Sequence, residues 1–387
     1  MIYLDNAATT RHKPKEVIDA MVNALQTMGN AGRGQHEDSL AADRIIFETR
    51  LKLSKFFGAS NPRQVAFSKN ATEALNIAIT GLANSGDHII TTAMEHNSVL
   101  RPIYRLANQD IITYDVVGLD KDGNLLMDDF ERLLKKNTKF VVVNHGSNVT
   151  GNLADLSAIS TFCKAHRLQL IVDASQTAGI FPINMTHLGI SALCFTGHKS
   201  LLGPQGIGGI CLAEDVIIPP LIVGGSGIKS FDPSQPKEMP SLLEAGTLNS
   251  HGIAGLHAAL DYIANQGMGQ LRMQEQELAG TFYKSINTIE GVKIYGDYSA
   301  MERCPIISLN IGDADAALVS FRLQEKFNIA TRPGAHCAPL VHNHFNTQDQ
   351  GMVRFSFSSF NTRLEVDQAI NAVRSIAHEE QCGMIDI

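Results

Sequence analysis

From about residue 60 onward, short runs of apolar residues alternate with stretches in which apolar and polar positions recur at helical spacing. The apolar runs are continuous, which is typical of strands that are buried on both faces of a parallel sheet. They predict strands at 65–67, 88–91, 140–143, 168–172 and 192–195. The stretches between them predict helices at about 71–84, 97–108, 126–137 and 154–166. This alternation predicts an α/β fold with a mostly parallel sheet flanked by helices.

The pattern changes in residues 223–241, which are rich in glycine, proline and serine. Loops longer than about 12–15 residues inside a compact domain are usually functional or mobile. Because this one precedes the segment 244–247 (Glu-Ala-Gly-Thr), we expect it near the entrance of a site. The pattern after the loop predicts helices at 251–266 and 270–287, then a strand, helix, strand and helix at 305–310, 314–326, 353–358 and 363–378. We therefore predict a large domain of residues 15–255 and a smaller α/β domain of residues 1–14 and 256–387.

The bulk composition excludes several classes of protein. The net charge of −7 argues against nucleic acid or an anionic membrane as the main partner. No apolar run approaches the ~18–20 residues needed to span a bilayer, and the N-terminus lacks a signal-peptide pattern. The six cysteines form no Cys-x-x-Cys pair, and we interpret residues 342–344 (His-Asn-His) as a solvated loop instead of a metal site. We expect a cytoplasmic protein without a bound metal.

Two residues at predicted strand ends carry the first chemical signal. Lys199 follows the 192–195 strand and precedes a glycine-rich segment at 203–209. A lysine held among small residues can lose its solvation and become the neutral amine that Schiff-base chemistry needs. Asp173 ends the 168–172 strand. Each residue alone could be ordinary, a solvated lysine or a turn-capping aspartate, but together they are the two protein groups that pyridoxal 5′-phosphate (PLP) requires.

Other polar residues also follow predicted strands, where ligands bind in open parallel sheets. Asn70 and Glu73 have the spacing of a capping box at a helix start, which could either cap the helix or bind a phosphate. His96 is either an ordinary histidine at a helix start or a ring that stacks on a cofactor and transfers protons. Residues 144–151 follow a buried strand and either satisfy a turn or contact a ligand.

Together these segments carry a resemblance to a known family. They resemble the class V, fold-type I PLP enzymes, and among these the group II cysteine desulfurases and selenocysteine lyases. The matching segments, in chain order, are 70–73 (Asn-Ala-Thr-Glu), 95–97 (Glu-His-Asn), 147–151 (Ser-Asn-Val-Thr-Gly), 172–176 (Val-Asp-Ala-Ser-Gln), 196–199 (Thr-Gly-His-Lys) and 244–247 (Glu-Ala-Gly-Thr). One such motif would be weak, but six in order are specific. The similarity runs from residue 3 to the last predicted helix.

The resemblance implies roles around the cofactor ring, which the large domain would bind. Lys199 would form the Schiff base and move protons. Asp173 would face the pyridine nitrogen, and His96 would stack on the ring. Asn148 and Gln176 would lie near the O3′ side of the ring.

The resemblance also implies a phosphate site and an oligomer. Four residues would hold the phosphate: Ala71, Thr72, Thr196 and His198. Thr247 would reach the phosphate from a second subunit. This last role implies a homodimer whose two active sites are shared.

Cys337 decides the expected reaction. It lies in residues 331–339 (Thr-Arg-Pro-Gly-Ala-His-Cys-Ala-Pro), which resemble the active-cysteine loop of group II desulfurases. The alternative is a packed small side chain, the commonest state of a free cysteine. Its flanking residues are typical of a loop, and His336 could raise its thiolate fraction. Arg354 would bind the carboxylate of the substrate with two hydrogen bonds.

The function expected from this resemblance is a cysteine desulfurase. It would convert L-cysteine to L-alanine and hold the sulfur as a persulfide on Cys337 for a protein acceptor. The alternatives are a selenocysteine lyase acting on L-selenocysteine, another class V reaction such as C–S cleavage or transamination, and a scaffold without catalysis. Lys199 and Asp173 argue against the scaffold.

Overall fold

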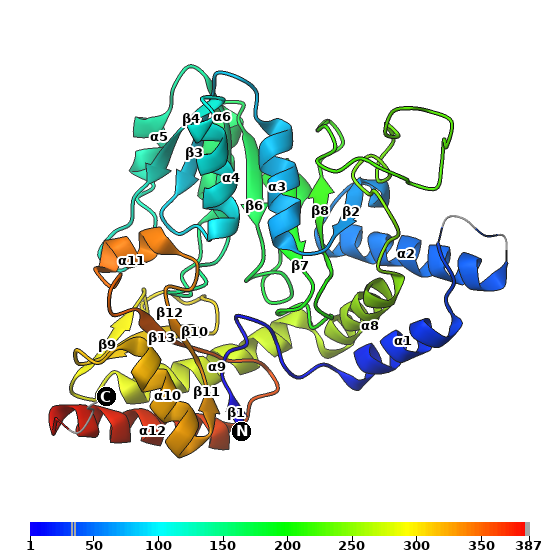
Figure 1. Cartoon of the computed structure of the whole chain (residues 1–387). Helices are drawn as coiled ribbons and strands as arrows, with labels where there is room; N and C mark the ends of the chain where they lie inside the picture. The colour runs from blue at the N-terminus through cyan, green and yellow to red at the C-terminus, as the bar shows by residue number, and fades with distance from the viewer. Residues whose placement is uncertain (32–33, 35, 384–387) are drawn as a thin grey trace.

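A seven-stranded sheet forms the centre of the computed structural model, which describes residues 1–31, 34 and 36–383 (Figure 1). In spatial order its strands are β2 (Val65–Ser68), β8 (Gly208–Leu212), β7 (Ala192–Thr196), β6 (Gln169–Asp173), β5 (Thr138–Asn144), β3 (Asp87–Thr92) and β4 (Ile112–Val117). The strands from β7 to β4 are parallel, whereas β8 is antiparallel to both of its neighbours. The predicted mostly parallel α/β fold is confirmed, although β4 and β8 have no counterpart among the predicted strands.

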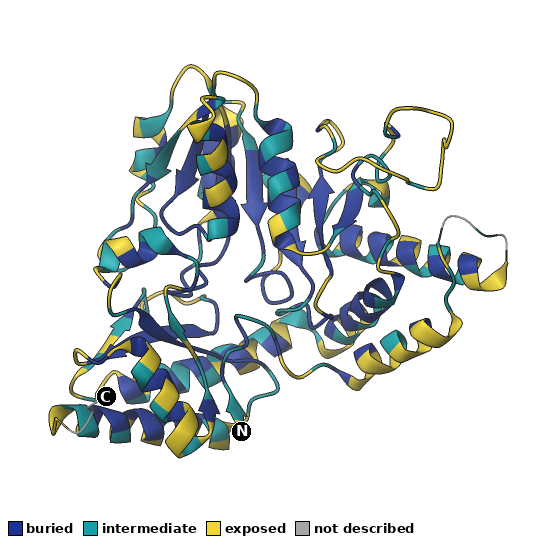
Figure 2. Cartoon of the chain, viewed as in Figure 1, coloured by how far each residue is buried: buried dark blue, intermediate teal, exposed yellow. Residues whose placement is uncertain are grey.

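Helices cover both faces of this sheet, which explains the continuous apolar runs. Phe140 and Val142 on β5 pack into one core, which includes α3 (Ala71–Leu82) and α4 (Asn97–Asn108). Val141 and Val143, the residues between and after them, pack into the other core. Strand residues on both faces are therefore buried, as the dark strands in Figure 2 show.

The second core contains several helices from distant parts of the sequence. They are α1 (Lys15–Thr27), α2 (Glu37–Phe56), α6 (Leu156–Ala165), α7 (Met185–Leu188) and α8 (Ser250–Gln266). The predicted helix at 126–137 is shorter in the structure, where it is α5 (Asp128–Leu133). A 3-10 helix, η1 (Pro62–Gln64), precedes β2.

A smaller antiparallel sheet forms the C-terminal part. Its strands, in spatial order, are β12 (Arg332–Gly334), β13 (Met352–Ser356), β10 (Ile306–Ile311) and β9 (Val292–Tyr295). Its helices are α9 (Met268–Ile286), α10 (Ala316–Phe327), α11 (Pro339–Phe345) and α12 (Arg363–Gln381). The N-terminal strand β1 (Ile2–Tyr3) pairs with β11 (Ile329–Ala330), so the chain start lies beside this part. The sequence pattern did not predict β9, β12 or α11.

Helix α9 connects the two parts of the chain. Leu271 near its start packs into a core of the large sheet, and Phe282 near its end packs into the core of the smaller sheet. The division into residues 15–255 and residues 1–14 with 256–387 stays a prediction. None of the helices in the described residues is long and apolar enough to cross a membrane.

The long loop at 223–241 lies away from the carboxyl ends of the parallel strands (Figure 1). None of its residues lines the main cavity described below. The expectation that it borders the entrance of the site is therefore wrong for a single chain. Sequence proximity to residues 244–247 was a poor guide, because the loop extends outward from the edge of the sheet.

Candidate active site

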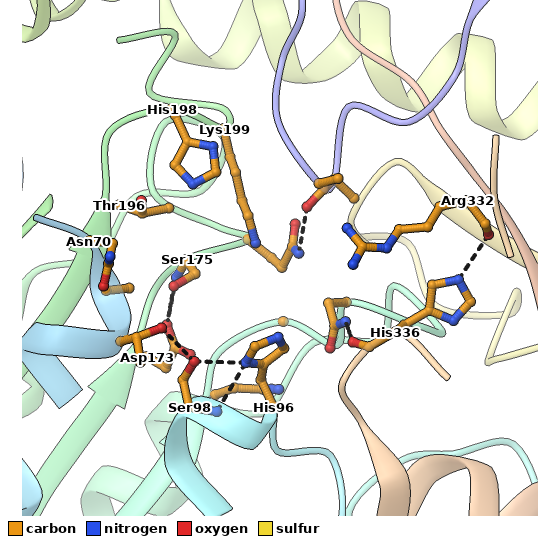
Figure 3. A pocket seen from close by; sticks show the side chains of 18 of the residues that line it. Asn70, His96, Ser98, Asp173, Ser175, Thr196, His198, Lys199, Arg332 and His336 are labelled. Carbon is orange, nitrogen blue, oxygen red and sulfur yellow. Dashed lines mark hydrogen bonds between the residues drawn. The ribbon is translucent and has the colours of Figure 1, made fainter. Parts of the chain in front are cut away.

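A cavity of about 220 Å³ lies at the carboxyl ends of the parallel strands, where residues of the smaller sheet close it (Figure 3). Ten predicted site residues line it: Ala71, Thr72, His96, Asn148, Asp173, Gln176, Thr196, His198, Lys199 and Arg354. Two others, Cys337 and Thr247, do not line it. The cavity therefore combines groups from five strand ends of one sheet with an arginine of the other.

One side of the cavity is built to hold an anion. The Oδ1 atom of Asn70 accepts a hydrogen bond from the backbone N–H of Glu73 at 3.0 Å and so caps helix α3. Within the described part of the chain, the N–H groups of Ala71 and Thr72 have no protein acceptor. Such a helix start attracts negative charge through its unpaired N–H groups and its dipole.

Two side chains extend this anion-binding region. The Oγ1 atom of Thr196 and the Nδ1 atom of His198 are buried and have no hydrogen-bond partner among the described residues. Both residues lie on the side of the cavity where Asn70 lies (Figure 3). Burial, with a smaller effect of Lys199, lowers the pKa of His198 to about 4. The ring is therefore neutral at physiological pH and can donate one N–H to a ligand.

Lys199 extends into the cavity from a segment that the N-terminus holds in place (Figure 3). Thr10 donates its hydroxyl to the Lys199 carbonyl oxygen at 2.9 Å, and Lys13 donates its amine to the His198 carbonyl oxygen at 2.9 Å. Burial and, to a smaller extent, the charge of Arg354 lower the pKa of Lys199 to about 8, while Asp173 opposes this effect. A fraction of the amine is therefore neutral near physiological pH.

Asp173 and His96 lie near each other in the cavity (Figure 3). The Oδ1 atom of Asp173 accepts hydrogen bonds from the N–H and the hydroxyl of Ser175, at 2.9 and 2.5 Å. The Nδ1 atom of His96 accepts the backbone N–H of Ser98 at 3.0 Å, which places the proton of a neutral ring on Nε2. Burial, with a smaller effect of Lys199, lowers the pKa of His96 to about 4. His96 is thus a neutral ring beside an ionisable carboxyl group.

Two arginines lie side by side on adjacent strands of the smaller sheet. Arg332 on β12 and Arg354 on β13 are directly paired in the ladder. Like charges in this position are destabilising. Arg354 is buried and donates to Asp5 Oδ1 and to the Asn148 carbonyl oxygen, each at 2.9 Å, while its Nε has no partner in the described part of the chain. The Arg332 guanidinium points into the cavity and, among the described residues, makes no ion pair (Figure 3).

The loop that carries Cys337 is held tightly beside the cavity. The Cys337 carbonyl oxygen accepts a hydrogen bond from the Asn97 N–H at 2.7 Å. The side-chain amide of Asn148 donates to the His336 carbonyl oxygen, also at 2.7 Å. His336 Nε2 lies 2.9 Å from the Arg332 carbonyl oxygen. His336 and Cys337 have φ angles of 51° and 57°, a conformation that costs non-glycine residues roughly 1–3 kcal/mol each. The loop is therefore constrained, and it places Cys337 next to the cavity wall, not on it.

Residues 2–369 match the class-V aminotransferase family. The chain belongs to this family. Its curated relatives include probable cysteine desulfurases from Synechocystis and Pyrococcus abyssi, which are 31% and 33% identical. Each alignment covers 97% of this chain, with 90% and 94% of the respective relative. The solved cysteine desulfurase from Thermococcus onnurineus NA1 is 32% identical, with a TM-score of 0.91 over 97% of this chain and 94% of that one.

Enzymes of the class-V aminotransferase family use PLP, and the cavity fits this group. A phosphate matches the free N–H groups at the start of α3 and the unpaired polar atoms of Thr196 and His198. A pyridine ring matches the neutral His96 and the carboxylate of Asp173, and an aldehyde matches the partly neutral amine of Lys199. Each part of the cofactor thus has a matching group in the cavity.

Several cavity residues were not among the predicted class-V site residues. Ser98 and Ser175 each come two residues after a predicted site residue, a spacing that favours local side-chain hydrogen bonds. Arg332 and His336 belong to the cysteine loop, but the sequence analysis gave Arg332 no role and His336 only an effect on Cys337. An arginine at the start of that loop was the signal that could have revealed a role in the cavity. Thr247 was expected to act across a subunit interface, which a single chain does not test.

Proposed function

We propose that this protein is a PLP-dependent cysteine desulfurase that converts L-cysteine to L-alanine and retains the sulfur as a persulfide on Cys337. Family membership and the curated relatives support the class of reaction. The observation that carries the proposal is the juxtaposition of Lys199 with Asp173 in a cavity closed by two arginines and the cysteine loop. PLP chemistry needs the lysine and the carboxylate, the arginines suit a substrate carboxylate, and the cysteine loop suits sulfur transfer.

The chain's own residues would hold the cofactor in three ways. Lys199 would bind it covalently, Asp173 would face the pyridine nitrogen, and His96 would cover one face of the ring. The phosphate would lie against Ala71, Thr72, Thr196 and His198, with Asn148 and Gln176 near the ring oxygen. When bound, PLP supplies an electron sink that allows the Cα–H bond of the substrate to break.

Lys199 would act as the base and then as the acid. With a pKa of about 8, its Nζ is partly deprotonated near neutral pH and can accept the Cα proton of the substrate. The same Nζ then holds this proton for return to the product. Arg354 contributes to the lowered pKa of Lys199, so a group that would bind the substrate also favours the neutral amine that acts as the base.

The two arginines would orient the amino acid by its carboxylate. Arg354 already uses two of its N–H groups, so its unpaired Nε and remaining hydrogens are available for a ligand. Arg332, its partner across the ladder, has its whole guanidinium free among the described residues. A substrate carboxylate between them would relieve their mutual repulsion, which gives this placement an energetic reason.

Cys337 would take the sulfur. Its thiolate would attack the substrate sulfur, forming the S–S bond while the electron pair of the Cβ–S bond stays with the substrate carbon. Cβ then takes a proton, and L-cysteine and the enzyme thiol become L-alanine and an enzyme persulfide. The atoms and electrons balance without an external oxidant or reductant. Because Cys337 lies beside the cavity wall, the substrate thiol would have to extend toward the loop.

The proposal includes three features of the wider assembly. The enzyme would work as a homodimer in which Thr247 of each subunit completes the phosphate site of the other. The persulfide would pass to a protein acceptor. The enzyme would act in the cytoplasm.

A selenocysteine lyase is the second candidate, and one observation favours it. Cys337 does not line the cavity. Selenium leaves without an attacking thiol, so that reaction would not need Cys337 to approach the substrate. C–S cleavage to pyruvate and sulfide, and transamination, are the other class V alternatives.

Mass spectrometry of the intact holoenzyme after incubation with L-cysteine tests the proposal. A desulfurase gains one sulfur atom and releases alanine in the same tube. The gain should disappear in Cys337→Ala but persist in Cys382→Ala, a control at an exposed cysteine. Pyruvate and sulfide without persulfide would instead indicate C–S cleavage, and turnover of L-selenocysteine alone would indicate the lyase. Full activity of Cys337→Ala on L-cysteine would refute the assignment of Cys337.

A further inference from the structure

Glu95 is a buried carboxyl group under the cavity that the proposed mechanism does not use. It lies between the end of β3 and the start of α4, directly before His96, and none of its surface is exposed. Its Oε1 atom accepts the Thr92 hydroxyl at 2.7 Å and the Asn144 backbone N–H at 2.9 Å. These two hydrogen bonds connect the ends of β3 and β5 through the residue that precedes His96.

The other side of this carboxyl group points to its protonation state. Among the described residues, its Oε2 atom has no hydrogen-bond partner, and neither has the Oδ1 atom of Asn144, the residue whose N–H already binds Oε1. Two buried acceptors without donors are costly, and a proton on Oε2 would convert one of them into a donor. An ionised Glu95 would instead be a buried charge with no cation in contact in the described part of the chain.

Asp173 is the charged group that faces Glu95, from the end of β6 next to β5. The other groups packed against Glu95, Thr92 and Asn144, are uncharged, and the neighbouring His96 is neutral. Two carboxylates at the ends of neighbouring strands would repel each other. Asp173 has the better anion site, since the N–H and hydroxyl of Ser175 both donate to it.

We propose that Glu95 is a neutral carboxylic acid in the working enzyme and acts as a positioning residue. It fixes the segment that carries His96 to the end of β5 and avoids a second negative charge next to Asp173. The roles of His96 and Asp173 rest on the proposed function. The protonation of Glu95 does not, because it follows from burial and hydrogen bonding alone.

The titration behaviour agrees with this assignment. Burial raises the pKa of Glu95 to about 8, although the hydrogen bonds from Thr92 and Asn144 oppose this effect; the Asp173 carboxylate adds to it. Glu95 therefore binds its proton more tightly in the folded state than in the unfolded state. Its contribution to stability is complete below the unfolded pKa of about 4.5 and is lost progressively as the pH rises to about 8. Above that pH a second negative charge appears beside Asp173.

Glu95→Gln imitates the neutral acid, because its amide provides one acceptor and a donor in the same places. Glu95→Ala leaves the Thr92 hydroxyl and the Asn144 N–H without their acceptor. Glu275→Gln is the matched control: Glu275 is also buried, its pKa is also raised to about 8 by burial, and it accepts one backbone N–H, from Ser359 at 3.0 Å. All three variants are compared with the wild type as holoenzymes.

Infrared difference spectroscopy gives the readout that does not depend on activity. At about pH 7, the wild-type minus Glu95→Gln spectrum should contain a protonated carboxylic-acid band, because the wild type has this group and the variant lacks it. The unfolding midpoint of the wild type should fall relative to that of Glu95→Gln as the pH rises from about 5 to about 8. A carboxylate band in the difference spectrum, or parallel pH curves, would overturn the proposal.

The pH profile separates a positioning role from a merely structural one. Glu95→Gln should keep kcat within about twofold of the wild type near neutral pH, whereas Glu95→Ala should lose about tenfold or more. The pH dependence of the bound cofactor's absorbance above about pH 8 should change in Glu95→Gln and stay unchanged in Glu275→Gln. A Glu95→Gln enzyme as inactive as Glu95→Ala would refute the neutral acid. If no variant and no wild type acts on L-cysteine while the infrared band is lost as expected, only the proposed function fails.

Discussion

Replacing Lys199 by methionine should make the cofactor-free protein more stable, although it removes the residue that the proposed catalysis needs. Burial lowers the pKa of Lys199 from 10.5 to about 8, so protonated Lys199 is less favourable in the folded state than in the unfolded state. At about 1.4 kcal/mol per pKa unit, this difference corresponds to about 3 kcal/mol at pH 7. Lys199 is only partly shielded from water, so we expect a gain of about 2–3 kcal/mol. Methionine keeps the length of the side chain and removes the charge.

The gain should depend on pH in one direction. Below about pH 8 both states bind the lysine proton, and the full cost to the wild type is present. Between about 8 and the unfolded value of about 10.5 the folded state has lost the proton, so wild-type stability rises with pH. The advantage of Lys199→Met should therefore shrink by about 2 kcal/mol between pH 7 and about pH 9.5.

Urea denaturation of the cofactor-free wild type and variant, over this pH range and at one protein concentration, measures the effect. Lys69→Met is the control, because this lysine side chain is 79% exposed and lies just before the start of α3, which borders the cavity. It should change stability by no more than about 0.5 kcal/mol at any pH. A Lys199→Met protein no more stable than the wild type at pH 7, or an advantage that stays constant with pH, would refute the reasoning.

Four further substitutions test separate parts of the site. Arg332→Gln should raise KM for L-cysteine at least about tenfold and leave stability within about 0.5 kcal/mol, as steady-state kinetics and urea curves would show. Arg354→Gln should raise KM and also destabilise the protein by about 3 kcal/mol, because Asp5 loses its partner. Equal effects of the two arginine substitutions on stability would contradict this difference between a free and a paired arginine. Asn70→Ala should cost about 1 kcal/mol and weaken PLP retention, measured by equilibrium dialysis. Cys337→Ala should retain bound PLP and its absorbance while forming no persulfide, and loss of the cofactor would indicate a structural role.

The strands that the sequence predicted are those buried on both faces, and the strands it missed have other patterns. Strand β4 lies at the sheet edge with Thr113 exposed, so its apolar run is interrupted. Strand β8 begins with Gly208 and Gly209, and its glycines looked like part of a loop. A Cβ atom at Gly209 would lie 2.6 Å from the Phe195 ring and 2.7 Å from the Ala66 carbonyl oxygen. Glycine is required there by close packing between strands, which a single segment does not reveal.

Most of the cavity lining was predictable, because the residues that follow parallel strands lie at the same edge of the sheet. Residues after β2, β3, β5, β6 and β7 must meet at one edge of the sheet, and the lining includes predicted residues after each of them. The smaller sheet is antiparallel, and its register depends on the pairing of β12 with β13. That register, and not any local pattern, places Arg332 opposite Arg354.

The sequence by itself determined the fold class, the family and the residues that follow each buried strand. Apolar runs, helix caps and turn residues act over a few neighbouring positions, so a linear pattern can record them. The tertiary structure decided the cost of burial at Lys199 and Glu95, the pairing of the two arginines and the place of Cys337 beside the cavity. These depend on distances between segments far apart in the chain and on the exclusion of water, which arise only when both sheets pack together.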